Sequence, residues 1–333
     1  MGNTPRSRPD AADRAAALVE LGTYLKARHY TFVTVTPLTH QRVLRNRSRP
    51  RSPDAPAPDL RDAFGWNLPF AHDLLPLPLL DTLLSAQVVS AQGNNTYLSR
   101  VRFSSLGGDV YVHSRYPTDQ EDAVFFGPDT YRFAGLIREE LAVRPLAEGS
   151  RVLDIGCGGG PGGMTAVRAA AGPVQELVLA DINSQAVLFS QANVRIAQMD
   201  RCMCVGSDLF SQVPEGPFDL IVSNPPYLVD AARRTYRHGG GEWGEGLSQR
   251  IVQESIAHLA PGGRLILYTG SAVVRGTDSF TGWAGDVAQR AGCTFLQREI
   301  DPDVFGEELD RPEYAGVDRI AAIGIVVQRP VLR

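Results

Sequence analysis

Cysteine, lysine and long apolar runs are all scarce in this sequence of 333 residues. Four cysteines are too few for a disulfide framework in so long a chain, and neither they nor the histidines show the spacing of metal ligands. No stretch approaches the ~18 consecutive apolar residues of a membrane span. The first thirty residues lack the apolar run and small-residue cleavage site of a secretory signal. These absences predict a cytoplasmic protein that has neither a metal site nor a membrane partner.

The composition that remains is ordinary for a soluble globular chain, with 43% hydrophobic and 21% charged residues. The net charge of −4 argues against a dedicated nucleic-acid binder, which usually carries a basic stripe. The charge is unevenly spread, because residues 1–58 hold ten Lys and Arg against four Asp and Glu. Their local charge of +6 leaves −10 on the remainder. We therefore favour a protein or small-molecule partner over a nucleic acid.

Residues 1–58 are predicted to form an N-terminal helix followed by a flexible linker. Asp10 is a suitable cap for a helix over 10–28, which has a loose apolar face. Arginines and prolines dominate the segment from Arg42 to Pro58, which cannot bury enough apolar area to offset the cost of ordering its backbone. An arginine-rich arm on RNA is the alternative for this segment. We expect deletion of residues 1–55 to leave the fold and the cofactor affinity nearly intact.

Residues 59–120 are predicted to form a small accessory domain that selects the substrate. A leucine-rich helical pattern covers 74–89, and an alternating apolar pattern follows from Tyr97 to Val112. The alternation is interrupted at Gly107-Gly108, which is a hairpin signal. A helix with a hairpin indicates an α+β domain.

Residues 121–333 are predicted to form the catalytic domain. Short apolar runs alternate there with helical stretches, which is typical of a mostly parallel sheet with helices on both faces. The fold class is therefore α/β, with a Rossmann-like seven-stranded sheet and the smaller N-terminal α+β domain. The seven strands are expected at 152–155, 177–182, 203–206, 220–223, 265–269, 295–300 and 320–327.

A glycine-rich loop follows the first of these strands in "RVLDIGCGGGPGG". Glycine allows such a loop to turn sharply and lets its N–H groups approach a ligand. Taken alone, the loop also fits a dinucleotide site. Asp181 ends the next strand, where a carboxylate can accept both hydroxyls of a ribose, and Asp208 ends the third, where an adenine amino group would lie. Acids at three successive strand ends, with Asp154 at the first, favour S-adenosylmethionine over NAD.

The motif Asn224-Pro225-Pro226-Tyr227 follows the fourth strand, at the sheet edge where ligands bind in open α/β folds. Proline fixes φ and has no N–H group, so the loop is stiff and presents carbonyl acceptors. The Asn224 side-chain oxygen and the Pro225 carbonyl can accept from one NH2 group and orient its nitrogen toward an electrophile. Tyr227 offers a flat face for stacking the substrate. A stiff turn without a catalytic role is the alternative reading of this motif.

The motifs "VLDIGCGGG", "LADINSQAV", "GSDLF" and "FDLIVSNPPYL" together resemble the class I S-adenosylmethionine-dependent methyltransferases with an NPPY motif, especially the release-factor N5-glutamine methyltransferases. The stretch "RHGGGEWGEGLSQR" resembles that family's GG-acidic-G-L segment, and the resemblance covers about residues 121–330. It implies substrate-amide contacts at Asn224, Pro225 and Tyr227. The segment "VFFGPDTYRF" is similar to the family's segment before the catalytic domain, which implies that Phe126, Asp129 and Thr130 lie near the cofactor or the substrate. Tyr131 and Pro226 are also predicted to contact the substrate. The predicted cofactor-binding residues are Asp154, Gly156, Cys157, Gly158, Gly160, Asp181, Ile182, Asp208, Leu209 and Asn224.

The sequence leaves more than one reaction open. The preferred function is methyl transfer from S-adenosylmethionine to an amide or amine nitrogen of a protein or small molecule. The alternative is a cyclase of natural-product biosynthesis that closes the cofactor's own methionine arm into azetidine-2-carboxylate and releases methylthioadenosine. That reaction needs a dry aromatic pocket, which Phe126, Tyr131 and Tyr227 would supply if they converged. A third possibility is a non-catalytic module that binds the cofactor. The N-terminal half departs from the helical pattern of the release-factor enzymes, and an acidic loop over 301–318 has no assigned role.

Overall fold

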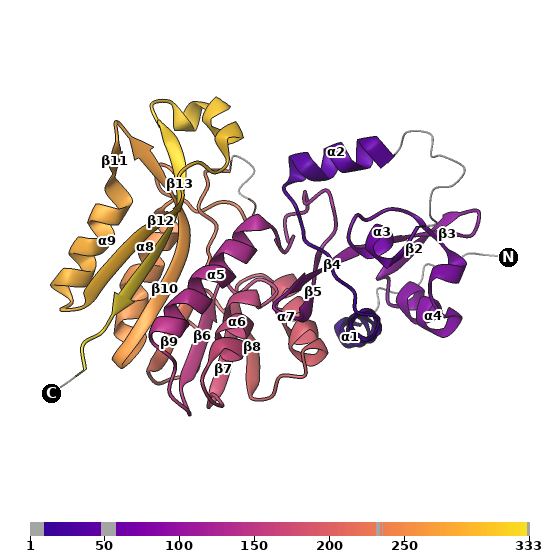
Figure 1. The fold of residues 1–333 in the computed structure, drawn as a ribbon, viewed down its shortest axis with the longest axis horizontal. Helices are drawn as coiled ribbons and strands as arrows, with labels where there is room; N and C mark the ends of the chain where they lie inside the picture. The colour runs from indigo at the N-terminus through magenta and orange to yellow at the C-terminus, as the bar shows by residue number, and fades with distance from the viewer. Residues whose placement is uncertain (1–9, 48–57, 231–233, 235, 332–333) are drawn as a thin grey trace. The chain divides into compact units, whose positions relative to one another are not determined.

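The computed structural model describes residues 10–47, 58–230, 234 and 236–331, and the chain forms two compact units. The N-terminal unit comprises residues 1–119, 124–128 and 191–199. The sheet unit comprises 120–123, 129–190 and 200–333. Figure 1 labels the helices and strands of both units.

Among its described residues up to 119, the N-terminal unit combines four α-helices and one short 3-10 helix with two small sheets. The predicted hairpin is present: β4 (Val101–Leu106) pairs antiparallel with β5 (Asp109–Ser114). Its turn places Gly107 at φ 61° and Gly108 at φ 87°, in the left-handed region that a tight hairpin of this kind requires. The other elements are α1 (Ala11–Ala27), α2 (Pro37–Arg47), α3 (Leu60–Phe64), η1 (His72–Leu74), α4 (Leu77–Ser85) and a sheet of order β1-β3-β2 from Phe70–Ala71, Thr96–Ser99 and Val89–Gly93.

The structure overturns the prediction that the segment after α1 is a flexible linker, because residues 37–47 form the helix α2. His40 on this helix is 1% exposed, stacks on Tyr116 at 4.2 Å between ring centroids and lies 5.2 Å from Trp66. Arg47 lies 4.9 Å above the Trp66 ring. The rings of Trp66 and Tyr116, which lie outside the segment, therefore bury His40 of α2, although the segment itself contains few apolar side chains. The rest of the predicted linker, residues 48–57, lies outside the described residues.

The packing of α1 argues against the expectation that residues 1–55 can be deleted with the fold nearly intact. Leu18, Leu21 and Leu25 of α1 are all 0% exposed. At Gly22 the chains approach so closely that an added Cβ would lie 2.2 Å from a side-chain carbon of Ile196. Deletion of residues 1–55 therefore removes a part of the N-terminal unit's core.

We expect Leu21→Ala to lower the free energy of unfolding by about 2–5 kcal/mol, since it removes a fully buried side chain and leaves a cavity. Chemical denaturation followed by circular dichroism measures the change. Leu38→Ala is the matched control, because Leu38 on α2 is 54% exposed, and its effect should stay within about 0.5 kcal/mol. Equal effects of the two substitutions would show that α1 is dispensable.

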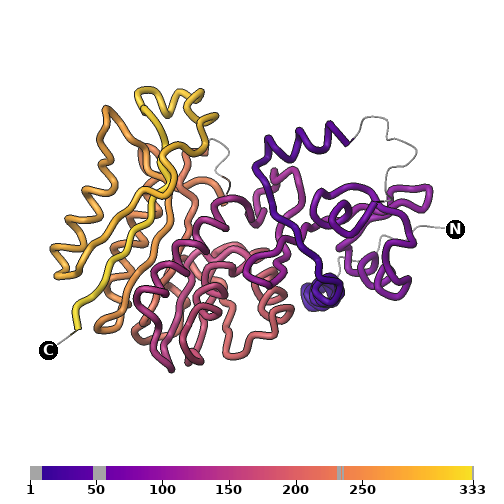
Figure 2. The backbone as a smooth tube through the Cα atoms, in the orientation of Figure 1, coloured from indigo at the N-terminus to yellow at the C-terminus, as the bar shows by residue number. Residues whose placement is uncertain are grey.

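The sheet unit confirms all seven predicted strands, in the spatial order β12-β13-β10-β9-β6-β7-β8. The strands β10, β9, β6, β7 and β8 run parallel, and β13 runs antiparallel to both of its neighbours. In Figure 2 the yellow β13 lies beside the orange β10, although α9 and β12 separate them in the sequence. The strands are β6 (Arg151–Ile155), β7 (Glu176–Asp181), β8 (Cys202–Gly206), β9 (Phe218–Ser223), β10 (Leu259–Val274), β12 (Thr294–Asp301) and β13 (Arg319–Gln328), with the short β11 (Thr277–Asp278) paired to β10.

Helices cover both faces of this sheet. A core cluster joins α8 (Gly246–His258) and α9 (Ser279–Arg290) to side chains such as Leu153 and Val178. On α6 (Pro161–Ala169), a Cβ added at Gly163 would contact Leu177 and Leu179 of β7. These residues alternate along the strand with Val178 of the core cluster, so their side chains point to the opposite face of the sheet, which α6 covers. The helix α5 (Pro128–Val143) lies on the face of α6, and α7 (Ser184–Ile196) follows β7. Among the described residues, no helix is both long and apolar enough to cross a membrane.

Candidate active site

The glycine-rich loop connects β6 to α6 at the carboxyl edge of the sheet. Gly156, Gly158 and Gly160 have φ values of 65°, 55° and 84°, so the turn needs glycine at these positions. Pro161 begins α6, where its missing N–H group costs nothing. The Asp154 carboxylate accepts from the Gly163 N–H group at 2.7 Å and so fixes the loop to the first turn of the helix. Burial raises the pKa of Asp154 to about 7, and this hydrogen bond opposes the rise.

Asp181 ends β7 and faces the same loop. One carboxylate oxygen accepts from the Gly158 N–H group at 2.8 Å, and the other accepts from the Asn183 N–H group at 2.8 Å. Burial raises the pKa of Asp181, and both hydrogen bonds oppose this effect. A carboxylate has about four lone-pair sites. The two backbone donors therefore leave capacity for two hydroxyl donors of a ligand.

The neighbours of Asp181 extend this site with apolar surface. Ile182, which follows Asp181 in the chain, is 62% exposed. Leu209, which follows strand β8, is 8% exposed. The exposed Asp208 forms an ion pair with Arg250 at 3.6 Å. Cys157 is buried, and its N–H group donates to the Ala180 carbonyl. An exposed apolar side chain next to a carboxylate suits a ligand that has a planar base and a diol: the base can pack on the apolar side chain, and the two hydroxyls can donate to the carboxylate.

The reaction motif begins where β9 ends, beside β6. The Ser223 hydroxyl donates to the Ile155 carbonyl at 2.7 Å and ties the ends of the two strands together. Asn224 follows and is partly exposed, and no described residue forms a hydrogen bond with its side chain. Pro225 is buried and Pro226 is partly exposed. The Asn224 carboxamide is thus held at the sheet edge by its neighbours and is available to a ligand.

Tyr227 is positioned by a buried carboxylate that sequence reasoning had placed near the substrate. The Tyr227 hydroxyl donates to one oxygen of Asp129 at 2.9 Å, and Tyr268 donates to the other at 2.8 Å. Arg132 also donates to Asp129, at 3.1 Å, and binds Asp301 at 2.7 Å. Burial raises the pKa of Tyr227, and the negative charge of Asp129 raises it further. Asp129 therefore fixes the position of the Tyr227 hydroxyl.

Three residues of this network were not predicted from the sequence: Tyr268, Arg132 and Asp301. A signal was available for Arg132, which lies three residues after Asp129 on one helix, at the spacing of neighbours on a helix surface. No local pattern pointed to Tyr268, which is 139 residues from Asp129 in the sequence.

The other predicted substrate residues before the glycine loop differ in their burial. Phe126 is 2% exposed and belongs to the N-terminal unit, where its ring stacks on His113 at 5.1 Å and contacts Tyr111. Thr130 is 3% exposed, and Tyr131 is partly exposed. Phe126 is therefore a core residue, and the aromatic pocket required for cyclisation receives no support from it.

Two glycines of the GG-acidic-G-L segment pack against the backbone of the reaction motif. A Cβ at Gly239 would lie 2.7 Å from the Pro226 carbonyl oxygen, and one at Gly244 would lie 2.3 Å from that of Tyr227. The Gly239 N–H group donates to the Leu228 carbonyl at 2.9 Å. The close approach of two backbones explains why this segment is rich in glycine.

Gly270 on β10 makes room for the Tyr227 ring, since an added Cβ would lie 2.3 Å from a ring carbon. We expect Gly270→Ala to displace the ring and lower turnover by roughly 10²-fold, because a displacement of about 1 Å at a reaction site has an effect of that size. Steady-state kinetics and a cofactor titration measure the outcome, and cofactor affinity should be retained. Gly282→Ala on α9 is the control, since its Cβ would meet no atom within 4 Å. Normal turnover by Gly270→Ala would mean that the orientation of Tyr227 is irrelevant.

Comparisons with known proteins identify the family of the chain. A family model described as "Methyltransferase small domain" matches residues 134–273. The release factor glutamine methyltransferase of Deinococcus radiodurans is 31% identical over 220 residues, which cover 63% of this chain and 73% of the relative. The chain belongs to the class I S-adenosylmethionine-dependent methyltransferases. Its cofactor is S-adenosylmethionine, and the seven-stranded sheet is the fold of that class.

Two further relatives of this methyltransferase are named for different acceptors. The ribosomal protein uL3 glutamine methyltransferase of Bordetella pertussis is 29% identical over 217 residues and covers 59% of this chain and 71% of the relative. The ribosomal RNA small subunit methyltransferase C of Salmonella arizonae is 33% identical over 115 residues, which are 34% of this chain and 30% of that relative.

The described residues fit S-adenosylmethionine. Asp181 has lone pairs free for the two ribose hydroxyls, and Ile182 offers an exposed apolar surface beside it. Apart from its two chain neighbours, no atom of the described residues lies within 4 Å of a Cβ position at Gly156, so a ligand can approach the loop backbone there. When bound, the cofactor supplies a methyl carbon made electrophilic by its sulfonium.

Proposed function

We propose that this methyltransferase acts on a planar or primary nitrogen, and that the side-chain amide of a protein glutamine is its first class of acceptor. The observation that carries the proposal is the Asn224 carboxamide, which no described residue engages and which stands at the strand end beside the glycine loop. Pro225 has no N–H group, so its peptide unit offers only an acceptor.

An NH2 group matches this arrangement of acceptors. The Asn224 side-chain oxygen and the Pro225 carbonyl accept its two hydrogens and turn the nitrogen toward the methyl donor. Both oxygens also stabilise the positive charge that grows on nitrogen during attack. A strong base is not needed, because the N–H groups become acidic as the new C–N bond forms. Tyr227, fixed by Asp129, provides the flat surface for an amide plane.

The relatives support a protein acceptor over a nucleobase. Two relatives that match over more than two thirds of their length, those from D. radiodurans and B. pertussis, carry names of glutamine methyltransferases. The named RNA methyltransferase matches over less than a third of its own length. The charge of −10 outside residues 1–58 also favours a protein acceptor. We further propose that residues 59–120 act as the domain that selects this acceptor, and that residues 121–333 act as the catalytic domain.

The test uses S-adenosylmethionine labelled on its methyl group. The protein is incubated with the D. radiodurans release factor, with ribosomal protein uL3, with small-subunit ribosomal RNA, and with no acceptor. We expect S-adenosylhomocysteine and label on a glutamine of one protein acceptor, identified by mass spectrometry. Label confined to RNA would replace the proposed acceptor class. Enzymatic release of methylthioadenosine without any acceptor would overturn methyl transfer to nitrogen in favour of cyclisation.

A further inference from the structure

Residues 302–318 form an insert that the proposed function leaves without a role. They connect β12 to β13, which are adjacent antiparallel strands that a loop of two to five residues can join. The insert contains the short helices η2 (Gly306–Asp310) and η3 (Pro312–Tyr314). A connection longer than the topology requires is often functional.

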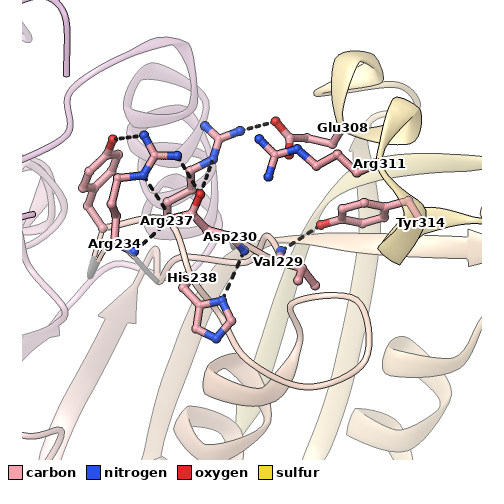
Figure 3. Close-up of polar contacts among 9 residues, drawn as sticks. Val229, Asp230, Arg234, Arg237, His238, Glu308, Arg311 and Tyr314 are labelled. Atoms are coloured by element: carbon pink, nitrogen blue, oxygen red, sulfur yellow. Dashed lines mark hydrogen bonds and ion pairs between the residues drawn. The ribbon is translucent and has the colours of Figure 1, made fainter. Parts of the chain in front are cut away.

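A buried carboxylate fastens this insert to the segment that follows the reaction motif. Glu308 is 2% exposed and pairs with Arg237 and, at 2.9 Å, with Arg311. Arg237 lies 3.8 Å from Asp230, which binds Arg234 at 2.6 Å. Figure 3 shows these charges as one continuous row that runs from the insert to the loop. A charge buried at this depth is stable only with its partners in place, so the pairing fixes one geometry.

The insert also contacts the reaction loop, residues 224–230, at two points. The Tyr314 hydroxyl accepts from the Val229 N–H group at 2.9 Å (Figure 3). The Phe305 ring lies edge-on to the Tyr227 ring at 5.8 Å between centroids and 69° between planes. Phe305 has φ 55°, a left-handed conformation that a bulky residue adopts only where its surroundings impose it. The insert thus holds the reaction loop by one backbone contact and one ring contact.

We propose that residues 302–318 position the reaction loop for methyl transfer, with Glu308 as the anchoring residue and Phe305 as the contact that orients Tyr227. The consequence for catalysis rests on the proposed function, whereas the restraint on the loop does not. A reaction loop that opens locally loses the alignment on which transfer depends. Glu308 does not touch the reacting atoms in this scheme and acts through Arg237.

Hydrogen exchange followed by mass spectrometry tests the restraint without any acceptor. In Glu308→Gln, amides of the peptide covering 224–230 should exchange at least about tenfold faster than in the unmodified protein, because local opening becomes easier. Glu307→Gln is the matched control, since Glu307 is the exposed neighbour in the same helix, and it should change nothing. Tyr314→Phe removes only the hydroxyl that accepts from the Val229 N–H group, and it should also speed exchange in this peptide. This variant tests the restraint if Glu308→Gln does not fold. Unchanged exchange in Tyr314→Phe and in any folded Glu308→Gln overturns the proposal.

Kinetics then test the consequence for catalysis, with the D. radiodurans release factor as acceptor, or ribosomal protein uL3 if that is the protein labelled. Glu308→Gln should lower kcat roughly tenfold and leave the cofactor Kd unchanged, and Glu308→Asp should restore part of the loss. Faster exchange with unchanged kcat would overturn the positioning role. If the unmodified protein methylates neither the release factor nor ribosomal protein uL3 but the exchange result holds, the proposed acceptor class fails and the restraint on the reaction loop stands.

Discussion

Asn224→Ala is expected to lower kcat at least about 100-fold, the usual effect of removing one oriented polar contact at a reacting centre. The substitution removes the side-chain acceptor and leaves Pro225 and Tyr227 in place. Cofactor affinity should change little, because Asp181 and the glycine loop lie on β7 and after β6 rather than on this motif.

Two measurements establish this result. Turnover is followed as S-adenosylhomocysteine formed with a labelled acceptor, and cofactor binding is followed by calorimetric titration. Gln289→Ala on α9 is a control that removes an exposed carboxamide elsewhere in the sheet unit. A variant at Asn224 that turns over normally would show that the motif is only a stiff turn.

Asp181→Ala should weaken cofactor binding by about 2–4 kcal/mol, or roughly 30- to 1,000-fold in Kd. The expected loss has two sources. The ribose hydroxyls lose their acceptor, and the Gly158 N–H group loses the partner that holds the loop in its left-handed turn.

Calorimetric titration with S-adenosylmethionine measures this change in affinity. Asp286→Ala on α9 removes an exposed carboxylate and should leave the Kd unaltered. Asp181→Asn keeps the size of the side chain and separates loss of charge from loss of shape. Equal affinity in the Ala variant and the unmodified protein would remove the assignment of the ribose site to Asp181.

The features that the sequence predicted correctly are those with a local cause. The strands appear as apolar runs between helical stretches, and the hairpin appears as alternation around Gly107-Gly108. Glycine loops and proline turns also carry their conformation in their own residues. For these reasons the sheet and the loop that follows β6 were predictable from short windows of sequence.

The features that the sequence did not predict depend on partners far along the chain. The helix α2 is stabilised by rings at Trp66 and Tyr116, which no window around residues 37–47 contains. Asp129 reaches Tyr227 and Tyr268 across 98 and 139 residues. The acidic loop over 301–318 had no role assigned from its sequence, and in the structure Glu308 is buried between arginines. Tertiary contacts determined each of these outcomes.

The end of helix α7 limits how this protein can be recombined with its relatives. The helix begins in the sheet unit, but its residues from Gln191 onward belong to the N-terminal unit. There Asn193 is 0% exposed, accepts from the Val112 N–H group at 2.7 Å and donates to the Val112 carbonyl at 3.2 Å. A chimera cut only near residue 120 would separate a buried carboxamide from the strand that satisfies it, at a cost of about 1–3 kcal/mol for each unpaired group. The N-terminal half therefore cannot be exchanged on its own. A chimera that keeps its stability must take residues 191–199 from the same parent as the N-terminal half.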